Sequence, residues 1–179
     1  TGIITTVAGT GTSGFSGDGG SATAARLNVP RDVAVTPDGG FVIADELNDR
    51  IRRVAPDGSI ATVAGLGAPG FSGDGGSALA AQFFGPRGVE VAPDGSILVA
   101  DRENRRVRRV SPAGIITTIA GTGVSCAPPT AACGDGRRAT EAELSNPVAL
   151  AVDEDGSVLV SDSSIHRVRR IDVDLRSPV

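Results

Sequence analysis

The sequence of 179 residues contains no Met, Trp, Tyr or Lys, and it has only five Phe and a single His. Without Trp and Tyr it lacks the usual stacking platforms for nucleic-acid bases and the usual aromatic hot spots of protein interfaces. All 17 basic residues are Arg, and the net charge of -4 argues against a general nucleic-acid binder, which normally carries a strongly basic domain. A ligand surface must therefore be built from Arg, Asp, Glu, backbone groups and aliphatic side chains.

Long hydrophobic runs are also absent, since no stretch approaches the ~20 apolar residues that a bilayer span requires. The first residues, TGIITTVAGTG, lack the charged start and the long apolar run of a signal peptide. We therefore expect no membrane span and no export signal, and the absence of Met at the first position indicates a mature or excised portion of a longer product. A hydrophobic content of 40% can form a core, so residues 1–179 are predicted to be one globular domain.

Cysteine is scarce, and both copies, Cys126 and Cys133, fall in one loop rich in Pro, Ala and Gly. This spacing favours a local disulfide that closes a small loop, with a free pair or metal ligands as the alternatives. A metal site would need more donors, and the only His is distant in the sequence, so we predict no metal and no cofactor. A disulfide would imply an oxidising compartment, which predicts a secreted or cell-surface protein of bacterial type.

The chain does contain a repeat. The segments GIITTVAGTG, GSIATVAGLG and GIITTIAGTG begin at Gly2, Gly58 and Gly114, which gives a period of 56 residues. The same register aligns Pro30 with Pro86, and it continues until a five-residue insertion in the third unit, which is the cysteine loop. The predicted repeat units are residues 1–57, 58–113 and 114–179.

Each unit contains four short runs of residues typical of β-strands, which in the first unit are residues 3–8, 33–35, 41–44 and 51–54. Turn sequences such as Pro37-Asp38-Gly39 separate the runs and predict antiparallel hairpins. Four such strands per unit are a propeller blade. The predicted fold is therefore all-β, a β-propeller of four-stranded antiparallel blades with three blade equivalents per chain. After the first run, Ser21 and Ser77 are expected to cap short Ala-rich helical turns.

The segments VAGTG, GFSGDGG, VIADELNDRIRRV and VADRENRRVRRV resemble NHL repeats, and the resemblance covers nearly the whole chain. In that family a strand ends in Ala-Asp, a polar turn with Asn follows, and an Arg begins the next strand. The matching structural positions are Asp45, Asn48 and Arg50, then Asp101, Asn104 and Arg106, and finally Asp162 and Arg167. The third unit departs from the pattern because Ile165 stands where Asn is expected. The resemblance implies a propeller, most often of six blades.

Three blades cannot close a ring, and the open ends would expose large apolar faces. The chain also begins with the run that elsewhere follows the Arg-rich strand, and its last unit lacks that following run. A second copy could supply both, so we predict a homodimer that forms one six-bladed ring. The alternative is that the missing blades belong to a longer chain.

The Arg-rich strands RIRRV, RVRRV and RVRRI could form an anion or nucleic-acid surface, but each recurs once per blade beside an Asp. This regularity favours Arg–Asp pairs between blades. The resemblance also implies a relation to enzymes on six-bladed scaffolds, namely zinc lyases that use several His and calcium lactonases that use central acids. His166 is the only His here, and the strand that should line the channel offers Asp32 and Glu90, whose third-unit equivalents are Ala. An enzyme with a channel site is therefore an alternative rather than the first prediction.

Positions that repeat build the fold of a propeller, whereas exposed positions that differ between blades are candidates for binding a partner. These candidates are Arg31, Arg87, Glu46, Arg102 and Glu103. We therefore predict a noncatalytic scaffold that presents one propeller face to a protein or a glycan. The alternatives are a hydrolase or lyase with a metal site in the channel, and a recently amplified propeller fragment with no activity of its own.

Overall fold

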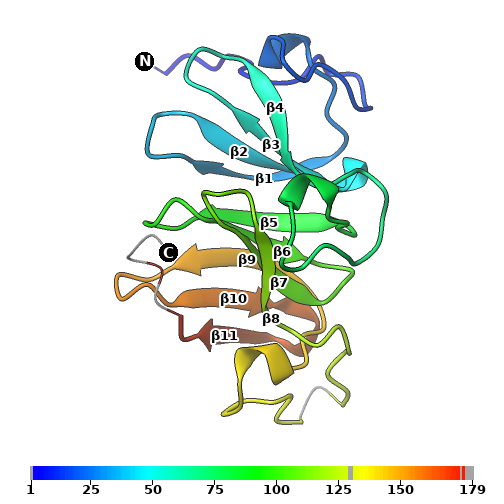
Figure 1. The fold of residues 1–179 in the computed structure, drawn as a ribbon, viewed down its shortest axis with the longest axis vertical. Coiled ribbons are helices and arrows are strands. Elements are labelled where there is room, and N and C mark those ends of the chain that lie inside the picture. Colours follow the sequence, from blue (N-terminus) through cyan, green and yellow to red (C-terminus); the bar gives the residue numbers. More distant parts are fainter. Residues whose placement is uncertain (1, 129–130, 174, 176–179) are drawn as a thin grey trace.

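The computed structural model describes residues 2–128, 131–173 and 175. Its strands form three antiparallel sheets, which follow one another along the long axis of the molecule (Figure 1). The first sheet contains β1 (Pro30–Val35), β2 (Phe41–Asp45), β3 (Arg50–Val54) and β4 (Ile60–Ala64). The second contains β5 (Pro86–Val91), β6 (Ile97–Asp101), β7 (Arg106–Val110) and β8 (Ile116–Ala120). The third contains β9 (Pro147–Val152), β10 (Val158–Asp162) and β11 (Arg167–Ile171).

Each four-stranded blade takes three strands from one repeat unit and its outermost strand from the next. In the first sheet the strand order is β1-β2-β3-β4, and β4 lies at the start of the second unit. The second sheet is completed in the same way by β8, which comes from the third unit. The predicted all-β fold of antiparallel blades is confirmed, but the limits of the sequence repeat do not coincide with the limits of the blades.

Tight turns connect the strands within each blade. Between β1 and β2, the backbone N–H of Gly39 donates to the carbonyl of Thr36, and the N–H of Thr36 donates to the carbonyl of Gly40, both at 2.9 Å. Gly39 has a φ of 89°, a conformation that favours glycine over residues with a side chain. The turn chemistry read from the Pro-Asp-Gly sequences therefore accounts for these hairpins.

The strand predicted over residues 3–8 is not formed. Residues 2–8 have no regular structure, and Ile3 and Ile4 are 90% and 98% exposed. The reason is that the equivalent strands, β4 and β8, pair with the edge of the blade before them, and the described chain has no blade before its first one. The third sheet shows the reciprocal gap, because β11 is its edge and the described residues supply no fourth strand.

Single 3-10 turns link the strands and blades, namely η1 (Ala22–Ala24), η2 (Glu46–Asn48), η3 (Ala78–Ala80), η4 (Ala139–Glu141) and η5 (Ser163–Ile165). The prediction that Ser21 and Ser77 cap helical turns was wrong, since neither side chain makes a cap hydrogen bond. The Ser21 hydroxyl instead lies 2.9 Å from the hydroxyl of Thr23, and a single 3-10 turn closes through its own backbone. Over the described ranges, no helix has the length and apolar character needed to cross a membrane.

The hydrophobic core lies between neighbouring blades. Phe83 is fully buried in a cluster to which both the first and the second sheet contribute. The two ends of the stack remain open, because Val33 and Val168 are 61% and 71% exposed, whereas their equivalents Val89 and Val107 are 2% and 0% exposed. The apolar end faces expected for an open half-ring are therefore present.

Candidate functional site

The candidate binding residues gather at one rim of the blade stack. The inner strands β1, β5 and β9 lie side by side. Each inner strand begins at this rim, opposite the residue at which β2, β6 or β10 ends. The polar turns that follow β2 and β6 therefore stand next to the first residues of β1 and β5.

A polar network at this rim centres on Glu46. Its carboxylate, only 6% exposed, accepts a hydrogen bond from the guanidinium of Arg31 and lies 3.9 Å from the guanidinium of Arg102 in the next blade. Arg102 also donates to Glu103 at 2.5 Å and, through Nε, to the side chain of Asn146 at 2.7 Å. Because Asn146 directly precedes β9, the network links all three blades.

The rim network presents charges of both signs to solvent. The side chains of Arg31, Arg102 and Glu103 remain 44%, 30% and 39% exposed. The Arg102–Glu103 pair is exposed on both sides, and such a pair contributes little to stability, so these two groups can exchange their internal partner for an external one at small cost. The arrangement suits recognition of a polar, charged surface.

Arg87 does not join this network. It is half-buried on β5, and the ion pairs among the described residues do not include it. Its place matches that of Arg31 on β1, but its own blade carries Arg102 where the first blade carries Glu46. The acid that orients Arg31 is thus missing for Arg87.

Asn146 was not singled out from the sequence, although it ties the third blade into the network. The comparison of blades contains a signal for it, because Val29 and Gly85 hold the equivalent positions before β1 and β5. A search restricted to charged residues overlooks such an amide.

The repeated Asp at the end of each second strand holds the loop of its own blade. The Asp45 carboxylate accepts hydrogen bonds from the backbone N–H of Asn28 and from the side chain of Asn48, both at 2.7 Å. The equivalent backbone N–H groups, those of Phe84 and Ser145, donate to the carboxylates of Asp101 and Asp162. The geometry of these positions is that of a fold-building contact.

The Arg that begins the third strand of each blade, β3, β7 or β11, contacts groups close to that strand. Arg50 and Arg106 each donate to the carbonyl two residues earlier and to a carbonyl that follows the next strand. Their guanidinium carbons lie 3.8 and 3.7 Å from the ring centres of Phe15 and Phe71. In the third blade the matching Arg167 lies 3.7 Å from Asp135.

The Arg–Asp pairs expected between blades lie within blades instead. Arg108 is fully buried, donates to Asp74 at 2.8 Å and lies 3.4 Å from Asp101. In the first blade the matching Arg52 makes the equivalent pairs, with Asp18 and Asp45. Each acid belongs either to the same sheet as its Arg or to the glycine-rich loop packed on that sheet. These two guanidinium groups are enclosed, so they offer no surface to an external anion.

Burial raises the pKa of Asp101 to about 6, although the N–H of Phe84, the side chain of Asn104 and the guanidinium of Arg108 oppose this. Because the folded-state pKa lies above 3.8, this group favours folding most below about pH 4, and the contribution is lost as the pH rises through about 6. The unfolding free energy of the wild type relative to Asp101→Asn should therefore fall across this window, by at most about 1.4 kcal/mol per pH unit. Denaturant titrations at several pH values measure the difference, in which the other carboxylates cancel. A difference that increases with pH would contradict this expectation.

The third blade departs from the repeat in two places that touch each other. The structure joins Cys126 and Cys133 in a disulfide, with Cα atoms 5.3 Å apart. Ile165, which replaces the Asn of the repeat, is 4% exposed and packs against both cysteines. In the first blade the equivalent Asn48 donates to the carbonyl of Gly14 in the glycine-rich loop. The inserted loop and Ile165 thus replace a hydrogen bond by an apolar contact.

The inner strands hold the acids considered for a channel enzyme. Asp32 accepts hydrogen bonds from the backbone N–H groups of Val33 and Val89 at 2.9 and 3.0 Å. Burial raises the pKa of Glu90, and the negative charge of Asp32 raises it further. His166 is exposed at the start of β11. Within the part of the chain that the structure describes, no three His, Cys, Asp or Glu side chains are grouped to hold a metal ion.

Comparison with known proteins places the chain among NHL repeats. A family model for the Teneurin NHL domain matches residues 115–175, and one for the NHL repeat matches residues 83–110. Teneurin-m of Drosophila melanogaster is 30% identical over 164 residues, which cover 87% of this chain and 5% of that protein. Teneurin-1 of Mus musculus is 31% identical over 190 residues, which cover 94% and 7%. The chain therefore spans only a small part of the length of these relatives.

Among solved structures, an auxiliary nutrient binding protein from Bacteroides thetaiotaomicron aligns with a TM-score of 0.63 and 23% identity, over 79% of this chain and 37% of that one. At this identity the likeness shows the fold alone. The bacterial origin expected from the sequence stays a prediction, because both teneurins come from animals. The repeat pattern, the antiparallel sheets and the two family matches agree, and the chain belongs to the NHL-repeat β-propeller family.

Proposed function

We propose that this chain is a noncatalytic protein-interaction module and that the rim network is its binding surface. The supporting observation is that residues differing from blade to blade, Arg31, Glu46, Arg102 and Glu103, converge in one network. The repeated guanidinium groups of the blade interiors are enclosed, whereas the variable ones keep access to solvent. Side chains of both signs on a partner protein match this rim better than the neutral hydroxyls of a glycan.

We further propose that a second copy completes the half-ring to six blades. The support is the pair of open apolar end faces, which a soluble protein normally covers. Two copies would join their rims into one face and double the binding surface. The disulfide between Cys126 and Cys133 supports a secreted or cell-surface location, since such bonds persist in oxidising compartments.

A hydrolase or lyase with its site in the channel is the second candidate. One observation favours it, namely the raised pKa of Glu90, since perturbed acids are common in active sites. The neighbouring Asp32, however, already accepts two backbone hydrogen bonds, one of them from the next blade. A structural role explains that carboxylate, so the interaction module is preferred.

A photo-reactive amino acid placed at Glu103 tests the proposed binding surface. The matched control carries it at Glu154, which is also exposed but lies in the turn between β9 and β10 at the opposite rim. After irradiation with extracellular proteins of the source organism, position 103 should give a discrete cross-linked partner several times more efficiently than position 154. Excess unmodified protein should suppress the product, and excess Arg102→Glu protein should not.

Three results would point elsewhere. Equal cross-linking from both positions would mean that the rim is not the binding surface. Turnover of lactone or ester substrates that is lost in Glu90→Gln would favour the channel enzyme. A complete lack of partners at either position would favour the amplified fragment without an activity of its own.

A further inference from the structure

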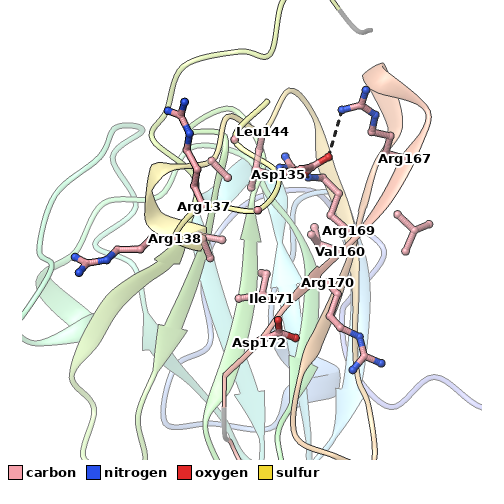
Figure 2. Close-up of a pocket in the computed structure, with 16 residues that line it drawn as sticks. Asp135, Arg137, Arg138, Leu144, Val160, Arg167, Arg169, Arg170, Ile171 and Asp172 are labelled. Atoms are coloured by element: carbon pink, nitrogen blue, oxygen red, sulfur yellow. Dashed lines mark hydrogen bonds and ion pairs between the residues drawn. The ribbon is translucent and has the colours of Figure 1, made fainter. Parts of the chain in front are cut away.

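A groove runs along the free edge of β11 (Figure 2). Its volume is about 550 Å³, and its two walls are β11 and the loop of residues 134–139. The apolar side chains of Leu144 and Val160, and that of Ile171 at the end of β11, also line the groove. Because β11 is the edge of its sheet, the groove exposes backbone groups that can pair with another strand.

In the other two blades the same place holds a strand. The N–H of Gly19 donates to the carbonyl of Ile60 at 2.8 Å, and the N–H of Ile60 donates to the carbonyl of Gly20 at 2.9 Å, while β4 pairs with β3 on its other side. The second blade repeats these contacts with β8. The third-blade counterparts of the two glycines, Gly136 and Arg137, line the groove. Both walls of the groove therefore match the two sides of a missing strand.

The apolar part of the groove matches one side chain of that strand. Ile116 of β8 is fully buried in a cluster that includes Ala78, Ala81, Phe83, Val99 and Val110. The third-blade counterparts of these residues all line the groove, namely Ala139, Ala142, Leu144, Val160 and Ile171. The counterpart of Ile116 in the first unit is Ile4, which is 98% exposed. The chain thus carries both an empty isoleucine site and an unburied isoleucine.

A threonine hydroxyl is missing from the groove as well. In the first blade the hydroxyl of Thr62 donates to the carboxylate of Asp18 at 2.8 Å, and the second blade repeats this bond at 2.7 Å. Asp135 is the third-blade counterpart, and no threonine of the described residues donates to it. Thr6 follows Ile4 by two residues, as Thr62 follows Ile60. A strand that buries Ile4 would therefore bring Thr6 to Asp135.

We infer that residues 3–8 of a second copy occupy this groove as the fourth strand of the third blade. The register of β7 with β8 places Ile4 opposite Ile171, and Thr6 opposite Arg169. This inference rests on the proposed two-copy ring, and it names the segment and the groove that close it.

The occupant must come from another copy, because residues 3–8 of the same chain lead into the first blade and not the third. The N–H of Gly9 donates to the carbonyl of Ala22 at 2.9 Å, just as Gly65 donates to Ala78 where the chain passes from β4 into the second blade. Residues 3–8 therefore belong to a blade placed before the first one. In the same chain, β11 lies at the other end of the stack from the N-terminal segment (Figure 1).

The open faces agree with this exchange. A third blade placed before the first blade of another copy would cover Val33 and Val35, which are 61% and 80% exposed, with the face that bears Val168. Two copies related by a two-fold axis make this contact twice, so neither end of either copy stays open. The exchange is therefore self-complementary.

Two neighbouring substitutions test the inference in the full chain. Ile4→Asp should weaken association by at least about 100-fold, because it would bury an unpaired carboxylate among alkyl groups. Ile3→Asp is the matched control, since its counterpart Ile115 stays 41% exposed on β8. Both isoleucines are exposed in the single chain, so both variants should fold alike. Light scattering coupled to size exclusion should give twice 17.9 kDa for the wild type and Ile3→Asp, and 17.9 kDa for Ile4→Asp.

Hydrogen exchange locates the contact. The amides of β11 that face the groove should be protected in the wild type and exposed in Ile4→Asp. A dimer that survives Ile4→Asp, or that leaves β11 unprotected, would overturn the inference by placing the interface elsewhere. A wild type that stays monomeric would overturn the second copy as the occupant and assign the groove to further blades of a longer chain. Neither result tests the proposed binding surface at the rim, because cross-linking from position 103 is measured separately in each variant.

Discussion

Replacing Arg108 with leucine is expected to lower the free energy of unfolding by about 3–5 kcal/mol at pH 7, because it leaves a buried carboxylate without its partner. Arg108 and Asp101 are both fully buried, and their side chains lie 3.4 Å apart. The guanidinium also donates to the backbone carbonyls of Ser72 and Gln82, which leucine cannot replace. Denaturant unfolding with an unchanged slope measures the loss.

The matched control is Arg53→Leu. Arg53 pairs with Asp38 in a position where the two side chains are 33% and 49% exposed, so its loss should cost less than about 1 kcal/mol. Adding Asp101→Asn to Arg108→Leu should recover part of the stability, because the buried charge is then removed. If Arg108→Leu costs no more than Arg53→Leu, the enclosed Arg does not hold the blade together.

Replacing Phe83 with alanine is expected to cost about 3–5 kcal/mol, because the ring fills the space between two blades. Phe83 is fully buried, and its cluster includes Ile51 of the first blade and Val99 of the second. The guanidinium of Arg108 lies 5.6 Å from the ring centre, so the cavity would also reach the buried ion pairs. Thermal or denaturant unfolding of the variant measures the change.

The residues equivalent to Phe83 in the other two units provide comparison variants. Leu144→Ala should cost about 2–5 kcal/mol, since Leu144 is 1% exposed in the cluster shared by the second and third blades. Leu27→Ala should cost less in the monomeric Ile4→Asp background, because Leu27 is only partly buried at the open face of the first blade. Equal losses for Leu27→Ala and Leu144→Ala in that background would contradict the assignment of the open face.

The sequence predicted those parts of the fold that depend on short-range chemistry. The period of the repeat and the Pro-Asp-Gly turns identify the hairpins, because a tight turn specifies which strands become neighbours. The run of residues 3–8 shows where this reasoning ends. It has the composition of a strand, yet a strand also needs an edge to pair with, and that edge does not come from adjacent sequence.

The candidate site was predicted residue by residue but not as a site. Comparing the blades identified Arg31, Glu46, Arg102 and Glu103, whereas their meeting depends on how closely one inner strand packs against the next. The same limit explains the Arg pairs. The sequence shows the spacing between Arg108 and Asp101. The second partner of Arg108 is Asp74, which lies in a loop, and no local sequence pattern predicts where that loop packs on the blade.

The offset between repeat unit and blade also bears on how the gene for such a chain can change. When a duplication begins and ends at unit boundaries, the first strand of the inserted unit completes the blade before it. The first strand of the following unit then completes the inserted blade. Every junction after the event is of a kind that existed before it, so no compensating mutation is needed at the seam. Deletion of a whole unit preserves the junctions in the same way. The number of repeat units can therefore change without disturbing any junction, as long as the blades can still close into a ring.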